Sequence, residues 1–206
     1  MQSVSTGYVD VHGKRVFHRY LKSGAKKDIV MLHGWSFTSR DWETPGLFNE
    51  YANLSFNVYA PDYPGFGMSE PSDFYSVKRG NIEASASFIK DYMQSLGVEH
   101  AVILGASMGG GMAILMGMAH PDMVDAVIAV APAWVENYTE KMKNIEKPVL
   151  LVWGSEDTVV DPHFGNKYRS AIKNSQLEIV EGSKHPVYLE KPKRFIEITT
   201  GFLKSL

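Results

Sequence analysis

The sequence predicts an α/β fold built on a mostly parallel, doubly wound sheet. Short apolar runs alternate with amphipathic segments along most of the 206-residue chain, the order expected of repeated strand–helix units. The apolar runs are rich in Val, Ile and Leu at every position rather than at every second one. Strands of this kind are covered by helices on both faces of a sheet.

The first elements expected along the chain are the two strands of an antiparallel hairpin at the edge of the sheet. Residues 7–10 and 15–20 are strand-like, and Gly13 supplies the turn between them. The first parallel strand follows as a continuous apolar run that ends at His33 and Gly34. The alternation then predicts a strand at 29–32, a helix at 40–52, a strand at 57–60, a helix at 81–96 and a strand at 101–104.

The second half of the chain continues the same alternation. Asp161 is expected to cap a helix that has Pro162 at its first position. No repeat, low-complexity tract or long linker interrupts the pattern, so one domain spanning residues 1–206 is predicted. The expected elements are helices at 110–119, 163–173 and 193–203 and strands at 126–130, 149–153 and 177–180.

Composition and charge indicate which kinds of molecule the protein binds. The net charge is −2 and the charges are interspersed, which argues against a nucleic-acid surface and a polybasic membrane patch. The uncharged stretch 101–119 is long enough to span a membrane, but three consecutive glycines interrupt it, so a strand, turn and helix are preferred. No cysteine and no secretory signal are present, and a cytoplasmic monomer or small homo-oligomer with a small-molecule partner is expected.

A serine at a sharp strand-to-helix turn is the first candidate for chemistry. Ser107 lies in the pentapeptide 105–109, directly after one apolar run and directly before a helix-compatible run, with Gly105 and Gly109 two residues away on either side. Small residues are needed there because the tight turn leaves no room for side chains. Such a pentapeptide arises by chance in roughly one chain in ten of this composition, so its context decides the interpretation.

The context consists of an acid and a base that follow later strands. Asp157 comes after the strand-like run 149–154, and His185 comes after the run 177–182. His185 would accept the proton of Ser107, and Asp157 would hold the other ring N–H of the imidazole. Glu156 and Asp161 are rival acids, although Asp161 is already explained as a helix cap.

Acyl transfer also requires donors for the oxyanion of the tetrahedral intermediate. The backbone N–H groups of Met108, directly after the serine, and of Trp35, after the first parallel strand, are the candidates. His33 is assigned a structural role beneath the site. No metal or cofactor is expected.

Five segments together resemble the α/β-hydrolase superfamily over nearly the whole chain, and the order Ser, Asp, His along the chain is that of the superfamily. The resemblance implies that the loop 62–69 shapes the pocket and does no chemistry. It also implies a lidless member, because only 131–147 separate the sixth strand from the acid-bearing strand, with room for a single short helix. The tail 182–192 is similar to the α/β-hydrolase domain-containing protein 14 group. The segments are 33–35, 62–69, 105–110, 154–157 and 182–186.

The function expected from these residues is that of a serine hydrolase acting on small carboxylic esters. A serine nucleophile excludes the activities of those family members whose nucleophile is aspartate. Ala106 stands where the family often has a larger residue, and the turn is expected to tolerate it. Phe37, Trp134 and Tyr188 are expected to wall the substrate pocket together with Trp35 and Met108. Two alternatives stay open: a ligand- or partner-binding protein with slow or no turnover, and an acyltransferase or perhydrolase that uses the same triad.

Overall fold

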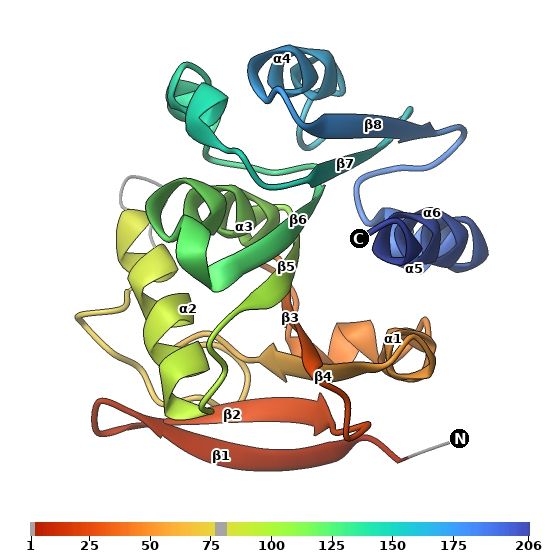
Figure 1. The fold of residues 1–206 in the computed structure, drawn as a ribbon. Helices are drawn as coiled ribbons and strands as arrows, with labels where there is room; N and C mark the ends of the chain where they lie inside the picture. Colours follow the sequence, from red (N-terminus) through yellow and green to blue (C-terminus); the bar gives the residue numbers. More distant parts are fainter. Residues whose placement is uncertain (1–2, 77–81) are drawn as a thin grey trace.

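An eight-stranded sheet with helices on both faces forms the framework of the protein (Figure 1). The computed structural model describes residues 3–76 and 82–206. The strand order is β1-β2-β4-β3-β5-β6-β7-β8, and every neighbouring pair from β4 onward is parallel. The predicted fold class is therefore confirmed. The strands are β1 (Ser5–Val11), β2 (Lys14–Leu21), β3 (Lys27–Leu32), β4 (Phe56–Pro61), β5 (Ala101–Ala106), β6 (Val124–Val130), β7 (Val149–Gly154) and β8 (Ser175–Val180).

The N-terminal hairpin forms one edge of the sheet, as the sequence predicts. β1 pairs antiparallel with β2, and β2 pairs antiparallel with β4, which joins the hairpin to the parallel strands. His12 and Gly13 form the two-residue turn with φ values of 50° and 78°. Positive φ at both positions matches the twist of a tight hairpin, and Asp10 Oδ1 accepts the Gly13 N–H at 2.9 Å.

The helices divide into two groups that bury opposite faces of the sheet (Figure 1). Side chains of β5 alternate between the two cores: Ile103 packs on one face, and Val102 and Leu104 on the other. A strand buried on both faces needs apolar residues throughout, which explains the continuous runs in the sequence. One group is α2 (Glu83–Ser95), α3 (Met108–Ala119) and α4 (His163–Ala171), and the other is α1 (Leu47–Asn53), α5 (Val187–Glu190) and α6 (Pro192–Lys204).

One predicted helix differs from the structure. The expected helix at 40–52 is broken into a 3₁₀ turn, Ser39–Trp42, and α1, because Gly46 has a left-handed φ of 82° that an α-helix does not allow. The segment 131–147, which has room for a single short helix, contains two 3₁₀ turns, Glu136–Tyr138 and Lys141–Asn144. A third 3₁₀ turn, Pro121–Met123, precedes β6.

The other predicted helices agree with the structure to within a few residues, and the short helix α5 was not predicted. α3 begins at Met108 and α4 ends at Ala171, while residue 81 of the expected helix 81–96 lies outside the described residues. Asp161 Oδ1 accepts the His163 N–H at 2.9 Å, the hydrogen bond expected of a cap at the start of α4. Across residues 3–76 and 82–206, none of the helices has both the length and the apolar character that a membrane span requires.

Candidate active site

Ser107 occupies a strained turn between β5 and α3. Its backbone torsions are φ 55° and ψ −117°, a conformation that non-glycine residues rarely adopt. The Ser107 N–H donates to the Val130 carbonyl at 2.8 Å, and its own carbonyl accepts the N–H groups of Gly111 at 2.9 Å and Ala133 at 3.0 Å. Because both backbone groups are bonded to neighbouring segments, the surrounding structure maintains the strained conformation.

The glycines on either side of Ser107 are required by the close approach of backbone. A Cβ atom on Gly105 would lie 2.0 Å from the carbonyl oxygen of Gly109, and one on Gly109 would lie 2.2 Å from the carbonyl oxygen of Leu32. The next glycines of α3 continue this tight packing, since a Cβ on Gly111 would lie 2.1 Å from the Ala133 carbonyl oxygen. The sequence explanation of the two small positions therefore has a direct steric basis.

The substitution Gly105→Ala is expected to lower the free energy of unfolding by about 3 kcal/mol or more, because its methyl group would overlap backbone that cannot move independently. The matched control is Gly201→Ala in α6, where a Cβ would meet nothing within 4 Å. This control should gain about 0.5–1 kcal/mol from helix propensity. Urea denaturation of the three proteins measures both changes, and equal stability of wild type and Gly105→Ala would contradict the steric argument.

Asp157 and His185 are brought together by the loops that follow β7 and β8. His185 Nδ1 lies 2.7 Å from Asp157 Oδ2, and Asp157 Oδ1 accepts the N–H groups of Val159 at 2.8 Å and Val160 at 3.0 Å. Burial alone would raise the pKa of the Asp157 carboxyl, but the hydrogen bonds from His185, Val160 and Val159 hold that pKa below its ordinary value. The carboxylate is therefore charged at neutral pH and accepts the Nδ1–H of His185.

The two rival acids lie elsewhere. The Asp161 carboxylate is exposed and pairs with His163 Nδ1 at 3.1 Å, next to the N–H that it caps. Glu156 is exposed, and its backbone N–H donates to the Ser183 carbonyl at 2.9 Å. In the described part of the chain, neither carboxylate is hydrogen-bonded to His185.

Ser107 and His185 line one cleft of about 530 Å³ at the carboxyl ends of the parallel strands. Since Nδ1 of His185 is bonded to Asp157, Nε2 is the nitrogen available to a serine hydroxyl. The Ser107 hydroxyl makes no hydrogen bond to another described side chain. In proteins without substrate such contacts are commonly long and shorten in the substrate complex.

The two candidate oxyanion donors are the N–H groups of Met108 and Trp35. Met108 is the first residue of α3, so its N–H has no partner within the helix. Trp35 follows Gly34, which lies against the elbow, since a Cβ on Gly34 would be 3.5 Å from the Cβ of Ser107. Neither N–H donates a hydrogen bond to a protein acceptor within the described residues, so both are free to bind a developing anion.

His33 lies beneath this turn and is fully buried. Its Nε2 accepts the Tyr63 N–H at 3.1 Å, so Nδ1 carries the proton and donates to the Gly34 carbonyl at 2.8 Å. Burial lowers the pKa of His33, which keeps the ring neutral. The imidazole therefore links two loops at the rim and has no free nitrogen for proton transfer.

The loop that follows β4 is held by one buried carboxylate. Asp62 accepts the Ser39 N–H at 2.7 Å and the Met68 N–H at 3.1 Å. Gly67 has a φ of 51°, and a Cβ on it would lie 2.0 Å from Asp62 Oδ2. These contacts explain why the loop needs glycine, and they assign Asp62 to structure.

The walls of the cleft correct two sequence predictions. The Met108 side chain does not line the cleft, because it is fully buried in the core. Trp35, Phe37 and Trp134 line the cleft, and the two tryptophan rings meet edge-to-face with centroids 5.5 Å apart. Tyr188 does not line it: the ring is buried against Trp42 at 4.4 Å, one layer behind Phe37. Tyr188 belongs to α5, which packs into the core. The sequence places this large aromatic residue close to His185 but does not show in which direction its side chain points.

Several cleft residues were not identified from the sequence. The segment after β6 supplies a carboxylate, Glu136, and the loop after β7 supplies the exposed Val159. Their positions in the sequence could have indicated this, since Glu136 and Val159 both follow the carboxyl ends of parallel strands, where the ligand crevice of such a sheet lies. The cleft residues without a sequence prediction are Ser36, Ala133, Glu136, Val159, Val160 and Pro186.

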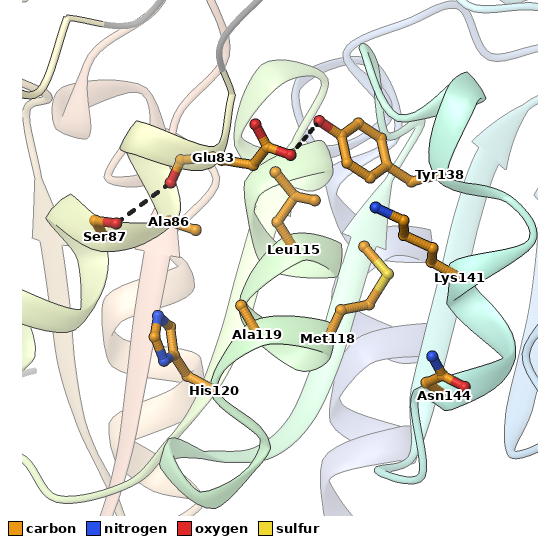
Figure 2. A pocket seen from close by; sticks show the side chains of 10 residues that line it. All are labelled: Glu83, Ala86, Ser87, Leu115, Met118, Ala119, His120, Tyr138, Lys141 and Asn144. Carbon is orange, nitrogen blue, oxygen red and sulfur yellow. Dashed lines mark hydrogen bonds between the residues drawn. The ribbon is translucent and has the colours of Figure 1, made fainter.

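A second hollow of about 330 Å³ lies between α2, α3 and the 3₁₀ turns that precede β7 (Figure 2). Its floor includes Leu115 and Met118, and Tyr138 donates to Glu83 Oε1 at 2.8 Å across its rim. Neither Ser107 nor His185 lines this hollow, so it is separate from the candidate site. Among the described residues no cluster of three or more His, Asp or Glu side chains is arranged to hold a metal ion.

Comparison with known proteins gives one family. The family model of the alpha/beta hydrolase fold matches residues 28–145 and 133–192. Protein ABHD14A of Danio rerio is 28% identical over 199 residues, which cover 96% of this chain and 69% of the relative. A human protein named "Putative protein-lysine deacylase ABHD14B" is 25% identical over 204 residues, covering 97% of this chain and 95% of the relative.

Solved structures give the same fold. The crystal structure of a "predicted CIB-like hydrolase" from Thermoplasma acidophilum matches with a TM-score of 0.96 at 50% sequence identity, covering 99% of each chain. Carboxylesterase CesB of Bacillus subtilis matches with a TM-score of 0.86 at 20% identity, covering 98% of this chain and 92% of the other. At that identity the second match concerns the fold alone.

Proposed function

The chain belongs to the alpha/beta hydrolase fold family, and from this premise we propose that it is a serine hydrolase that cleaves small carboxylic esters through an acyl-enzyme intermediate. The curated relatives named above also agree with the resemblance to the ABHD14 group. The observation that carries the proposal is the 2.7 Å pair of Asp157 and His185 at a cleft that also contains Ser107. A base oriented by an acid is what activates a serine hydroxyl.

In the first half of the proposed reaction, Ser107 Oγ attacks the carbonyl carbon of the ester while His185 Nε2 accepts the hydroxyl proton. The carbonyl oxygen becomes an oxyanion, and the N–H groups of Met108 and Trp35 are the donors proposed for it. The charged Asp157 carboxylate stabilises the imidazolium that forms. When the intermediate collapses, the C–O bond to the alcohol breaks and the imidazolium returns its proton to the departing alkoxide, which leaves as the alcohol.

In the second half, a water molecule replaces the alcohol. His185 accepts a proton from the water as its oxygen attacks the acyl carbon, and the bond to Ser107 Oγ then breaks. The same imidazolium protonates the serine, so the carboxylic acid leaves and the residues return to their starting protonation states. No cofactor or metal is needed to balance these steps.

The size of the cleft supports small substrates. A volume of about 530 Å³ accommodates a short acyl chain and a small alcohol, and the aromatic walls favour apolar groups. The segment between β6 and β7 contains two 3₁₀ turns rather than a helical lid, so little protein is available to cover a long lipid chain.

Covalent labelling tests the proposal. A serine-directed fluorophosphonate is expected to label the protein once, and mass spectrometry of the digest should place the label on Ser107. His185→Ala should fold normally and label far more slowly, because the hydroxyl then has no base. A folded wild-type protein that stays unlabelled would favour the ligand-binding alternative. In parallel, p-nitrophenyl esters of increasing acyl length are expected to show the highest kcat/KM for short chains.

Acyl transfer remains the second candidate because it uses the same acyl-enzyme. The human relative's name concerns acyl groups on protein lysine, so the tests should include an acetyl-lysine peptide beside the esters. Product analysis with added amine or peroxide separates the two outcomes: hydrolysis gives only the free acid, and transfer gives the acylated acceptor.

A further inference from the structure

Among the described residues, one charged side chain at the wall of the candidate cleft has no partner of opposite charge. Apart from His185, Glu136 is the single ionisable side chain among the described residues that line the cleft, and neither lysine nor arginine is among them. In the described part of the chain, Glu136 forms no ion pair. A negative wall repels substrates that carry a carboxylate and attracts substrates that carry a cation.

The local backbone fixes the position of this carboxylate. Glu136 Oε1 accepts the Trp134 N–H at 3.3 Å, which stabilises the turn in which Trp134 has a positive φ of 67°. Its Oε2 has no hydrogen-bond partner within the described residues. Turn formation therefore explains one of the two oxygens and leaves the other available to a ligand.

Two tryptophans lie beside Glu136 in the same cleft. Trp35 is 52% exposed, and its ring meets the ring of Trp134 edge-to-face at 5.5 Å. Trp134 is separated from Glu136 by a single residue. Tryptophan is the strongest of the aromatic side chains in binding cations through its ring face, and aromatic rings next to a carboxylate are suited to alkylammonium groups.

The segment that carries Glu136 is anchored from behind. Tyr138 donates to Glu83 Oε1 on α2 at 2.8 Å (Figure 2), and Thr139 Oγ1 donates to the Glu136 carbonyl at 2.8 Å. Lys141, the nearest cation in this segment, lies over the Tyr138 ring at 5.6 Å and lines the second hollow rather than the cleft. Within residues 3–76 and 82–206, the carboxylate is thus held in place and no lysine lines the cleft beside it.

We propose that the cleft selects acyl substrates whose alcohol or thiol portion carries an alkylammonium group, which binds between Glu136 and the rings of Trp35 and Trp134. This inference rests on the proposed ester hydrolysis and adds a substrate class to it. A cation at this position gains attraction from both the carboxylate and the ring faces.

Two thioesters of nearly identical shape test the inference. Acetylthiocholine carries a trimethylammonium group, and 3,3-dimethylbutyl thioacetate carries a neutral tert-butyl group in its place. The released thiol is followed with a disulfide reagent, which does not react with the protein because the chain contains no cysteine, and the rate without protein is subtracted. Wild type is expected to prefer the cationic thioester by about tenfold in kcat/KM, and Glu136→Gln to reduce that ratio by about fivefold.

The ratio of kcat/KM for the two thioesters distinguishes a loss of selectivity from a general loss of activity. A general loss of activity lowers both rates and leaves their ratio unchanged. Glu140→Gln removes the same charge from an exposed position in the same segment that does not line the cleft, and it should keep the wild-type ratio. A wild-type ratio near one, or a Glu136→Gln variant that keeps the full preference, would overturn the inference.

A binding measurement keeps this test independent of turnover. Quenching of tryptophan fluorescence by acetylthiocholine is titrated in Ser107→Ala and in the double variant with Glu136→Gln. The inference expects about fivefold weaker binding in the double variant. Equal affinity overturns the inference even if esters are cleaved, whereas unequal affinity without turnover or labelling retains the cation site and rejects the proposed hydrolysis.

Discussion

Replacing Ser107 by alanine is expected to lower kcat for a p-nitrophenyl ester by about 10⁶-fold. The hydroxyl is the only group of the protein that forms a bond to the acyl carbon in the proposed reaction. The substitution leaves the elbow intact, because the bonds to Val130, Gly111 and Ala133 use backbone atoms alone. Steady-state kinetics with a circular dichroism spectrum of each protein measures the loss and establishes that the variant is folded.

Two further variants show whether the loss belongs to the proposed triad. Ser87→Ala removes a hydroxyl from the second hollow and should keep wild-type activity. His185→Ala should lose nearly as much activity as Ser107→Ala, and the double variant should lose little more, because residues that act as one unit are not additive. Substantial activity in folded Ser107→Ala would mean that another residue attacks the substrate.

The second large effect is expected for Asp157→Asn, which should lower kcat by about 10⁴-fold. The asparagine can still accept the Val159 and Val160 N–H groups through its oxygen, and its amide then faces His185. A donor at that position requires an unprotonated Nδ1, so the ring proton moves to Nε2. An imidazole in this tautomer cannot accept the proton of Ser107.

The controls for Asp157→Asn are the two rival acids. Asp161→Asn changes an exposed carboxylate that pairs with His163, and Glu156→Gln changes an exposed side chain next to Asp157. Each should stay within a factor of about three of wild type, as expected for solvent-exposed charges. If either loses as much activity as Asp157→Asn, the acid has been assigned to the wrong residue.

The sheet was predictable because strand burial leaves a strong sequence pattern. β5 and β7 are buried on both faces, so nearly every position is apolar and the strands can be identified without knowledge of their neighbours. The prediction of one helix at 40–52 was wrong for a local reason. Gly46 adopts a left-handed backbone conformation, and the helical spacing of apolar residues gives no sign of it. The capping box of Thr38 and Asp41 was a readable sign that a turn begins there.

The candidate site was predictable where backbone geometry dictates the residue type. Gly105 and Gly109 allow Ser107 its turn, and such steric requirements appear directly in the sequence. The walls of the cleft depend instead on the direction of each side chain. Tyr188 faces the core and Glu136 faces the cleft, although the sequence offers no period or motif that distinguishes them.

The hydrogen bond from Ser107 to Val130 has a consequence for how such a protein can diversify. The attacking atom is positioned by the end of β6, a central strand, whereas Trp134 and Glu136 belong to the segment that comes after it. The segment between Ala133 and β7 can therefore be substituted, extended by insertions or changed in charge while Ser107 keeps its geometry. The nucleophile and the part of the substrate preference that depends on Trp134 and Glu136 are carried by separate stretches of polypeptide, and each can be inherited or redesigned without the other.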